Sequence, residues 1–176
     1  ADIAYGFTTI ERSDPAYYAV SLMNNVLGQY ALGGRLGDSI RERQGMAYYV
    51  SSGFEANPIA GPLLIRAGVA PGNVDRAIAS IDEELRRIRA GGVTARELDE
   101  SRQYLVGAMP RQLETSAGIA GFLQNAEFFG LGLDFDARLP ELLAAVTLDE
   151  VHAAARRLLD PDRAAIVIAG PYADAD

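Results

Sequence analysis

The chain has 176 residues, of which 49% are apolar and 23% charged, a balance typical of one globular domain with a substantial core. Its 24 acidic residues outnumber 16 basic ones, which argues against nucleic acid and anionic membrane surfaces as partners. Lysine and cysteine are absent and His152 is the only histidine, so lysine, thiol and two-histidine zinc chemistry are excluded.

The first part of the chain is predicted to form a strand and two helical segments. Residues 3–10 are typical of a strand, and because the sequence opens inside this element we expect a piece of a longer chain or one subunit of a pair. Ser13-Asp14-Pro15 predicts the start of a helix that ends near Gly28, and residues 36–43 form a shorter helical segment. No apolar run approaches the ~20 residues of a membrane-spanning helix, which predicts a soluble chain in the cytoplasm or the periplasm.

A hairpin and a long amphipathic helix are expected next. Residues 46–54 and 62–69 form the two strands of the hairpin, since turn-forming residues separate them. The helix that follows buries an apolar stripe and ends at Gly91-Gly92. The stripe consists of Val74, Ile78, Ile81, Leu85 and Ile88.

The rest of the chain is predicted to be a run of helices and a final strand. Two capping boxes, Thr94-x-x-Glu97 and Thr147-x-x-Glu150, each open a helix. Pro110 should kink or end the first of these helices, because it removes a backbone donor. The remaining elements are two helical stretches and a strand, at 116–129, 135–146 and 164–169.

This order of elements predicts a two-layer α/β fold in which residues 1–176 form a single domain. Four strands separated by long helices imply a mixed, largely antiparallel sheet with the helices packed on one face. The other face of such a sheet needs a partner or water.

Several conspicuous residues are assigned structural rather than chemical roles. The segment Gly33-Gly34-Arg35-Leu36-Gly37 lacks the Lys-Ser/Thr ending of a phosphate-binding loop and does not match the dinucleotide fingerprint, so we expect a flexible or tight loop before a helix. His152 lies on an amphipathic helix and is expected at its surface or partly buried. The paired carboxylates fall on predicted solvent faces or in first helical turns.

One constellation can carry chemistry. Arg41 lies near the end of the short helix, and Tyr48 follows seven residues later on the next strand, after a turn at Gln44-Gly45. A guanidinium and a phenol that converge there would both donate hydrogen bonds to an oxyanion or to peptide carbonyls. Spacing alone favours the simpler alternative, in which Arg41 is solvated and Tyr48 packs in the sheet.

The motif around these residues resembles that of the pitrilysin/insulinase family of zinc metallopeptidases. The match is to the second, zinc-free copy of the family's repeated domain, whose pattern is approximately N-x-L-G…R-L…I-R-E-x-x-G-L-A-Y. The segments that carry it are Asn25-Val26-Leu27-Gly28, Gly34-Arg35-Leu36 and Ile40-Arg41-Glu42-Arg43-Gln44-Gly45-Met46-Ala47-Tyr48. The layout downstream fits along nearly the whole chain, and Met46 in place of the usual Leu is a mild departure.

The resemblance implies a fold similar to the mitochondrial processing peptidase and LuxS metallohydrolases, and a clam-shell arrangement of two domains. One domain of the family carries zinc through H-x-x-E-H and a distal Glu, and the other closes over the peptide. By position in the motif, the closing domain contributes Arg41, which would hold the substrate, and Tyr48, which would stabilise the tetrahedral intermediate. The chain itself has no H-x-x-E-H motif, so no metal ligand is expected in it.

These observations lead to one preferred hypothesis and two rivals. The chain is expected to be the zinc-free half of a metalloendopeptidase, inactive alone, with a homologous zinc-bearing domain and a peptide or unfolded polypeptide as partners. The first rival is a catalytically inactive scaffold relative, like core subunits of respiratory complexes. The second is a free-standing ligand-binding module.

Overall fold

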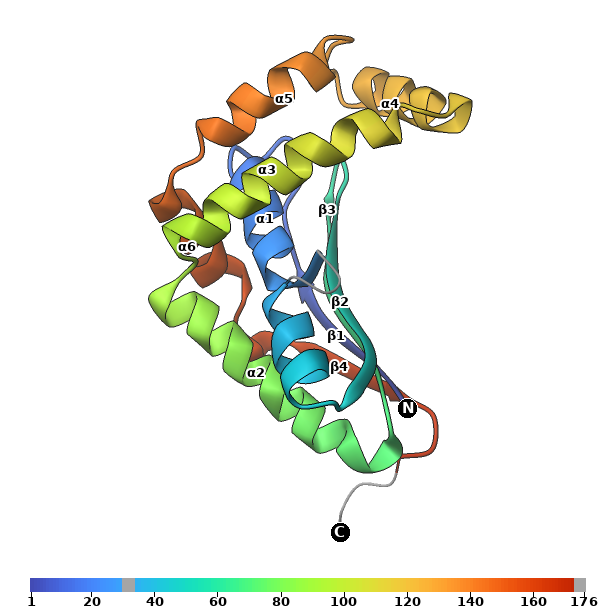
Figure 1. Ribbon diagram of the computed structural model, residues 1–176, viewed down its shortest axis with the longest axis vertical. Coiled ribbons are helices and arrows are strands. Elements are labelled where there is room, and N and C mark those ends of the chain that lie inside the picture. The colour runs from blue at the N-terminus through green and yellow to red at the C-terminus, as the bar shows by residue number, and fades with distance from the viewer. Residues whose placement is uncertain (30–33, 173–176) are drawn as a thin grey trace.

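The computed structural model describes residues 1–29 and 34–172, which form a four-stranded sheet with helices on one side of it (Figure 1). The strands lie in the order β2-β3-β1-β4, and every neighbouring pair is antiparallel. Their bounds are Asp2–Thr8 (β1), Ala47–Ala56 (β2), Ala60–Val69 (β3) and Ala165–Ala169 (β4). The predicted fold class is confirmed. Where a mixed, largely antiparallel sheet was expected, the described strands are antiparallel throughout, because both β3 and β4 run opposite to the central strand β1.

The helices follow the predicted order closely. Their bounds are Tyr17–Asn24 (α1), Val74–Gly91 (α2), Ala95–Gln112 (α3), Ser116–Phe128 (α4), Phe135–Ala144 (α5) and Leu148–Leu158 (α6). Two segments are π-helical, η1 (Asn25–Gln29) and η2 (Gly37–Arg43). The single helix expected from residue 13 to Gly28 is therefore divided into α1 and η1.

The core lies between the sheet and the helices. Alternate residues of β1, Ile3, Tyr5 and Phe7, are buried, as the period of two along a strand requires. Of the predicted apolar stripe on α2, all members are buried except Ile78, which is partly buried against the core. The pattern of apolar residues thus correctly identified the inward faces.

Helix caps agree with the sequence, whereas Pro110 does not end α3. Both capping boxes are formed, by Thr94 with Glu97 and by Thr147 with Glu150. The helix continues past Pro110 to Gln112, and the proline carbonyl accepts a hydrogen bond from the Leu113 N–H at 3.0 Å. Proline removes a donor from the helix but leaves its acceptor in place.

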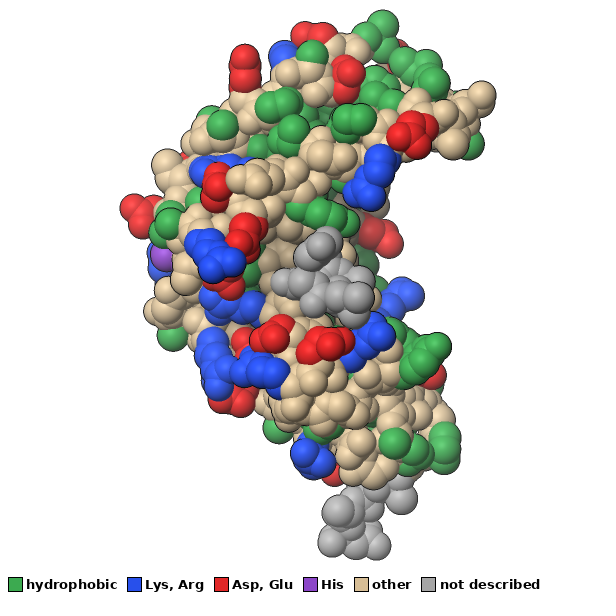
Figure 2. All heavy atoms as spheres, viewed as in Figure 1, with side chains coloured by type: hydrophobic (Ala, Val, Ile, Leu, Met, Phe, Trp, Pro, Cys, Tyr) green, Lys and Arg blue, Asp and Glu red, His purple; other side chains and the backbone are tan. Residues whose placement is uncertain are grey.

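The two ends of the molecule have different surfaces. Figure 2 shows acidic and basic side chains intermixed over the face that carries α2, whereas apolar side chains gather where α4 and α5 lie. The exposed large apolar side chains of α4 and the loop after it are Ile119, Leu123, Phe128 and Leu133. None of the helices described is long and apolar enough to cross a membrane.

Candidate functional site

The motif that contains Arg41 and Tyr48 forms a helix, a tight bend and the start of an edge strand. Gly45 has φ 60°, a left-handed conformation that glycine adopts without steric cost. Its N–H donates to the Arg41 carbonyl at 3.0 Å, and the Met46 N–H donates to the Ile40 carbonyl at 3.1 Å. These bonds end η2 and turn the chain back, so that β2 contacts the helix it has just left.

Tyr48 occupies an irregularity of the sheet. Ala47 pairs with Val69 and Tyr49 pairs with Gly68, so Tyr48 is an extra residue without a cross-strand partner. Ala47 and Val50 are both buried, whereas the Tyr48 residue is 88% exposed. A β-bulge re-aims a side chain in this way. The alternative expectation, that Tyr48 packs in the sheet, is therefore wrong.

Arg41 is also accessible. Its side chain is 42% exposed and lies 3.8 Å from the Glu42 carboxylate, a distance at which an exposed ion pair contributes little. Both groups of the predicted pair are thus open to a ligand from adjoining segments, η2 and β2. No hydrogen bond connects the two side chains within the described structure, and their convergence on one substrate stays a prediction.

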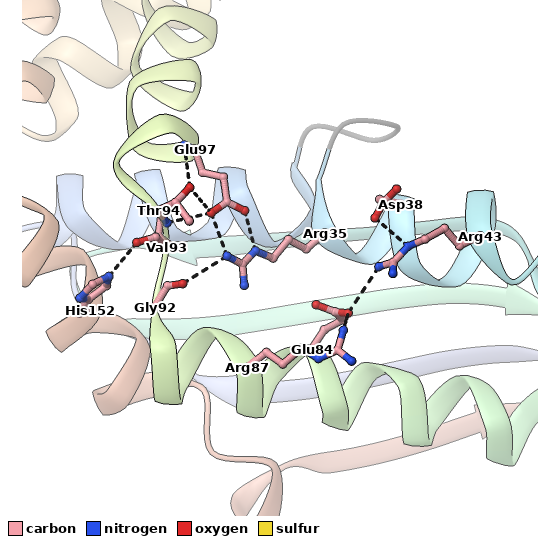
Figure 3. Close-up of polar contacts among 10 residues, drawn as sticks. All are labelled: Arg35, Asp38, Arg43, Glu84, Arg87, Gly92, Val93, Thr94, Glu97 and His152. Carbon is pink, nitrogen blue, oxygen red and sulfur yellow. Dashed lines mark hydrogen bonds and ion pairs between the residues drawn. The ribbon is translucent and has the colours of Figure 1, made fainter.

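Polar residues at the end of η2 contact α2, where Arg43 lies near Glu84 (Figure 3). Arg43 Nε lies 2.9 Å from Asp38 Oδ2, and Arg43 Nη2 lies 3.9 Å from the buried carboxylate of Glu84. One residue further, Gln44 Nε2 donates to Ser80 Oγ at 3.2 Å. Arg43 and Gln44 therefore contact α2 although both are exposed.

A stronger anchor lies just before η2 and was missed in the sequence. Arg35 Nε donates to Glu97 Oε1 at 2.6 Å, and Nη2 donates to Glu97 Oε2 at 2.8 Å and to the Gly92 carbonyl at 3.2 Å. The capping box identified Glu97, but no local spacing connects it with an arginine 62 residues away. Burial raises the pKa of Glu97, yet the hydrogen bonds from Arg35 and Thr94 outweigh it and lower the pKa to about 2.

The glycines of the motif bring two chain segments into contact. A Cβ on Gly34 would lie 2.7 Å from the Gly28 Cα, and a Cβ on Gly28 would lie 3.1 Å from the Ser52 backbone nitrogen on β2. Gly28 and Gly34 are therefore needed for close packing beside β2. Gly33, the first residue of the segment, lies outside the described residues.

Tyr49, next to Tyr48, has a different environment on the uncovered face of the sheet. A Cβ on Gly68 would lie 2.4 Å from the Tyr49 ring, which shows that the ring lies across this glycine. The Tyr49 hydroxyl donates to Asp2 Oδ1 at 2.6 Å, and this bond raises the pKa of the phenol. Tyr49 is thus tied to the sheet while Tyr48 projects from it.

The described residues do not fit a zinc ion. No group of three or more His, Asp or Glu side chains in this part of the chain could hold a metal. The ring of His152 is used in another way, because its Nε2 lies 2.8 Å from the Val93 carbonyl. This contact agrees with the prediction that His152 is partly buried and has a structural role. What the site offers is two hydrogen-bond donors, a guanidinium and a phenol, without a metal.

Comparison with known proteins gives this geometry a context. Residues 1–105 match the model of the family domain described as "Peptidase M16 inactive domain". A protein of Bacillus subtilis named "Uncharacterized zinc protease YmxG" is 30% identical over 169 residues, which cover 96% of this chain and 41% of that protein. A protein of Helicobacter pylori named "Non-peptidase homolog YmxG" is 27% identical over 135 residues, covering 74% of this chain and 30% of the relative.

A solved structure supports the fold assignment. The crystal structure of a peptidase M16 inactive domain from Pseudomonas fluorescens superimposes with a TM-score of 0.77 at 30% identity, over 94% of this chain and 39% of that chain. The chain therefore spans about two fifths of the Bacillus relative and of the Pseudomonas structure. The resemblance that the sequence motif suggested is confirmed at the level of sequence and of fold.

Proposed function

Since the chain belongs to the peptidase M16 family as its inactive domain, we propose that it closes over a peptide and completes the active site of a zinc-bearing homologous domain. The observation that supports this most directly is that Tyr48 at the bulge and Arg41 on the helix before it are both exposed. Both groups are donors, and the chain contributes them without a metal of its own.

The division of labour follows from the chemistry of the residues. The zinc of the partner domain, when bound, supplies the activated water and polarises the scissile carbonyl. The guanidinium of Arg41 binds a carbonyl of the peptide and orients it. The phenol of Tyr48 donates a hydrogen bond to the oxygen that gains negative charge when the carbonyl is attacked. A peptide in extended form can also pair with an edge strand by strand addition, for which the regular strand β4 is better suited than the bulged strand β2.

Reconstitution tests this proposal. The 176-residue chain alone is expected to show no metal-dependent peptide cleavage, because it lacks a zinc site. Combination with a homologous half that carries H-x-x-E-H, on the same polypeptide or as a separate subunit, is expected to produce cleavage of an unfolded polypeptide. Cleavage by the purified chain alone, or equal cleavage by the zinc-bearing half without it, would contradict the proposal.

A second candidate function is a scaffold without peptidase activity. One observation favours it, namely that the Helicobacter relative is named a non-peptidase homolog. The exposure of both Arg41 and Tyr48 supports the first candidate instead. The two are distinguished by whether the partner half contains the zinc motif and whether the assembled protein cleaves peptides.

A further inference from the structure

Arg35 forms the best-ordered polar contact near the motif. Its guanidinium makes two parallel bonds to Glu97 and a third to the Gly92 carbonyl. The two side chains are only 22% and 26% exposed, so solvent and salt screen the pair less than an ion pair on the surface. Bidentate arginine–carboxylate pairs combine strength with a fixed geometry.

The residues that Arg35 binds, Glu97 and Gly92, are themselves held by further contacts. Figure 3 shows that three consecutive residues between α2 and α3 are each held from a different direction. Arg35 binds the Gly92 carbonyl, His152 of α6 contacts the Val93 carbonyl at 2.8 Å, and Thr94 exchanges hydrogen bonds with Glu97 in the capping box. Glu97 is therefore a fixed point to which Arg35 is bound.

Arg35, the other partner in this contact, lies close in sequence to the proposed site. Arg35 lies two residues before η2, and Arg41 follows on the same helical segment. π-Helical geometry is rare and needs support from surrounding structure. The further polar contacts described between η2 and α2 run through Arg43 and Gln44, which are both exposed. Arg35, in contrast, is partly buried, and its partners are Glu97 of α3 and the Gly92 carbonyl.

We propose that Arg35, bound to Glu97 and Gly92, is a positioning residue that fixes η2 and thereby aims Arg41 and Tyr48 at the substrate. This inference rests on the proposed function and adds to it a residue that does not touch the peptide. A misplacement of about 1 Å in a catalytic group can cost on the order of a hundredfold in rate. Loss of the anchor should therefore lower catalysis without removing either donor.

The first experiment uses the assembled peptidase, with the zinc-bearing half present. Arg35→Lys keeps the charge but cannot form the bidentate pair, and we expect kcat/KM to fall about tenfold or more. In an Arg41→Ala, Tyr48→Phe background the same change should cost less than about twofold, because the groups it positions are already removed. An equal loss in both backgrounds would mean general destabilisation and would overturn the inference.

A matched control is available on α2. Arg89 also binds a carboxylate with two nitrogens, both 3.2 Å from Asp160, but this pair joins α2 to the segment before β4 rather than to the motif. Arg89→Lys should lower the melting temperature to a similar degree and leave kcat/KM unchanged. A loss of activity equal to that of Arg35→Lys would also overturn the positioning role.

A second readout needs only the 176-residue chain. The amide protons of Gly45 and Met46 are bonded to the Arg41 and Ile40 carbonyls. Arg35→Lys should accelerate their hydrogen exchange several-fold more than Arg89→Lys does, and equal exchange in the two variants would contradict the anchor. If removing Arg41 and Tyr48 leaves activity intact, the proposed function fails, and the positioning role with it. If only Arg35→Lys is without effect, the positioning role alone fails.

Discussion

Tyr48 and Tyr49 are consecutive residues whose side chains differ in how far they are accessible to a ligand. The Tyr49 ring lies across Gly68 and its hydroxyl is bonded to Asp2, whereas Tyr48 projects from the bulge and is 88% exposed. A regular strand would send one of the two side chains into the core. The bulge allows both to be outside, and it leaves the phenol of Tyr48 open to a ligand.

Removal of the Tyr48 hydroxyl should lower turnover. In the assembled peptidase, Tyr48→Phe is expected to reduce kcat by roughly tenfold or more, within the scale of losing one oxyanion donor. Tyr49→Phe is the matched control, since it removes the neighbouring hydroxyl, and it should leave kcat unchanged. Steady-state kinetics on one peptide substrate measures both. Equal turnover of wild type and Tyr48→Phe would remove Tyr48 from the mechanism.

Gly91 and Gly92 are adjacent but should respond oppositely to substitution by alanine. A Cβ on Gly91 meets nothing within 4 Å, and alanine in a helix is favoured by up to ~1 kcal/mol. Gly92 has φ 72°, and its Cβ would lie 2.0 Å from His152 Nε2. Gly92→Ala should therefore destabilise the chain by roughly 2 kcal/mol or more, whereas Gly91→Ala should not. Urea unfolding measures the difference, and equal midpoints would contradict both the contact with His152 and the backbone strain at Gly92.

At the scale of elements, the two capping boxes show how one local motif acquires different roles. Both begin a helix with the same Thr-x-x-Glu exchange of hydrogen bonds. Only Glu97 also binds a distant arginine. The loops before both boxes are held by another helix, since His152 of α6 contacts the Val93 carbonyl and Arg102 of α3 donates to the Val146 carbonyl. The box of α3 therefore joins the start of η2 to α3, while the box of α6 caps its own helix.

This difference predicts a difference in acid stability. The folded pKa of Glu97 is about 2 and its ordinary value 4.5, so its contribution to stability is complete above pH 4.5 and is lost as the pH falls toward 2. The loss amounts to about 3 kcal/mol at most. Unfolding measured between pH 2 and 6 should show a weaker pH dependence for Glu97→Gln than for the wild type. Glu150→Gln, which removes an exposed cap without an arginine partner, should change the slope less; identical slopes for all three proteins would refute the assignment.

Across the whole molecule, the sheet has two edges that differ in protection. Strand β2 has register irregularities at both ends and carries Glu55, features that discourage pairing with another chain. Strand β4, with the sequence Ala165-Ile166-Val167-Ile168-Ala169, pairs with β1 without irregularity and carries no charge. Val167 is 63% exposed on it. Short length is the main protection that β4 has.

An exposed apolar edge should make the isolated chain prone to self-association. Val167→Lys places a charge on this edge and is expected to lower light scattering of concentrated solutions. Ile59→Lys, at an exposed apolar residue that lies between β2 and β3, serves as the control with the same change in charge. If both variants lower scattering equally, the loss of an exposed apolar side chain rather than the β4 edge is responsible.

Local patterns in the amino-acid sequence were enough to predict most of the elements, their inward faces and the motif. Apolar periodicity identified the buried residues of α2, and the Thr-x-x-Glu pattern located two helix starts, because both signals arise from contacts within a few residues. The residues from Ile40 to Tyr48 identified the family in the same local way. All of these patterns can be recognised from residues that lie close together in the sequence.

Which residues of the motif are exposed and which are bound to other elements follows from how the chain packs in three dimensions. The bulge at Tyr48 exists only through the register between β2 and β3, and the partnership of Arg35 with Glu97 joins residues 62 positions apart. Register and long-range pairing depend on how whole elements pack, and no short stretch of sequence contains that information.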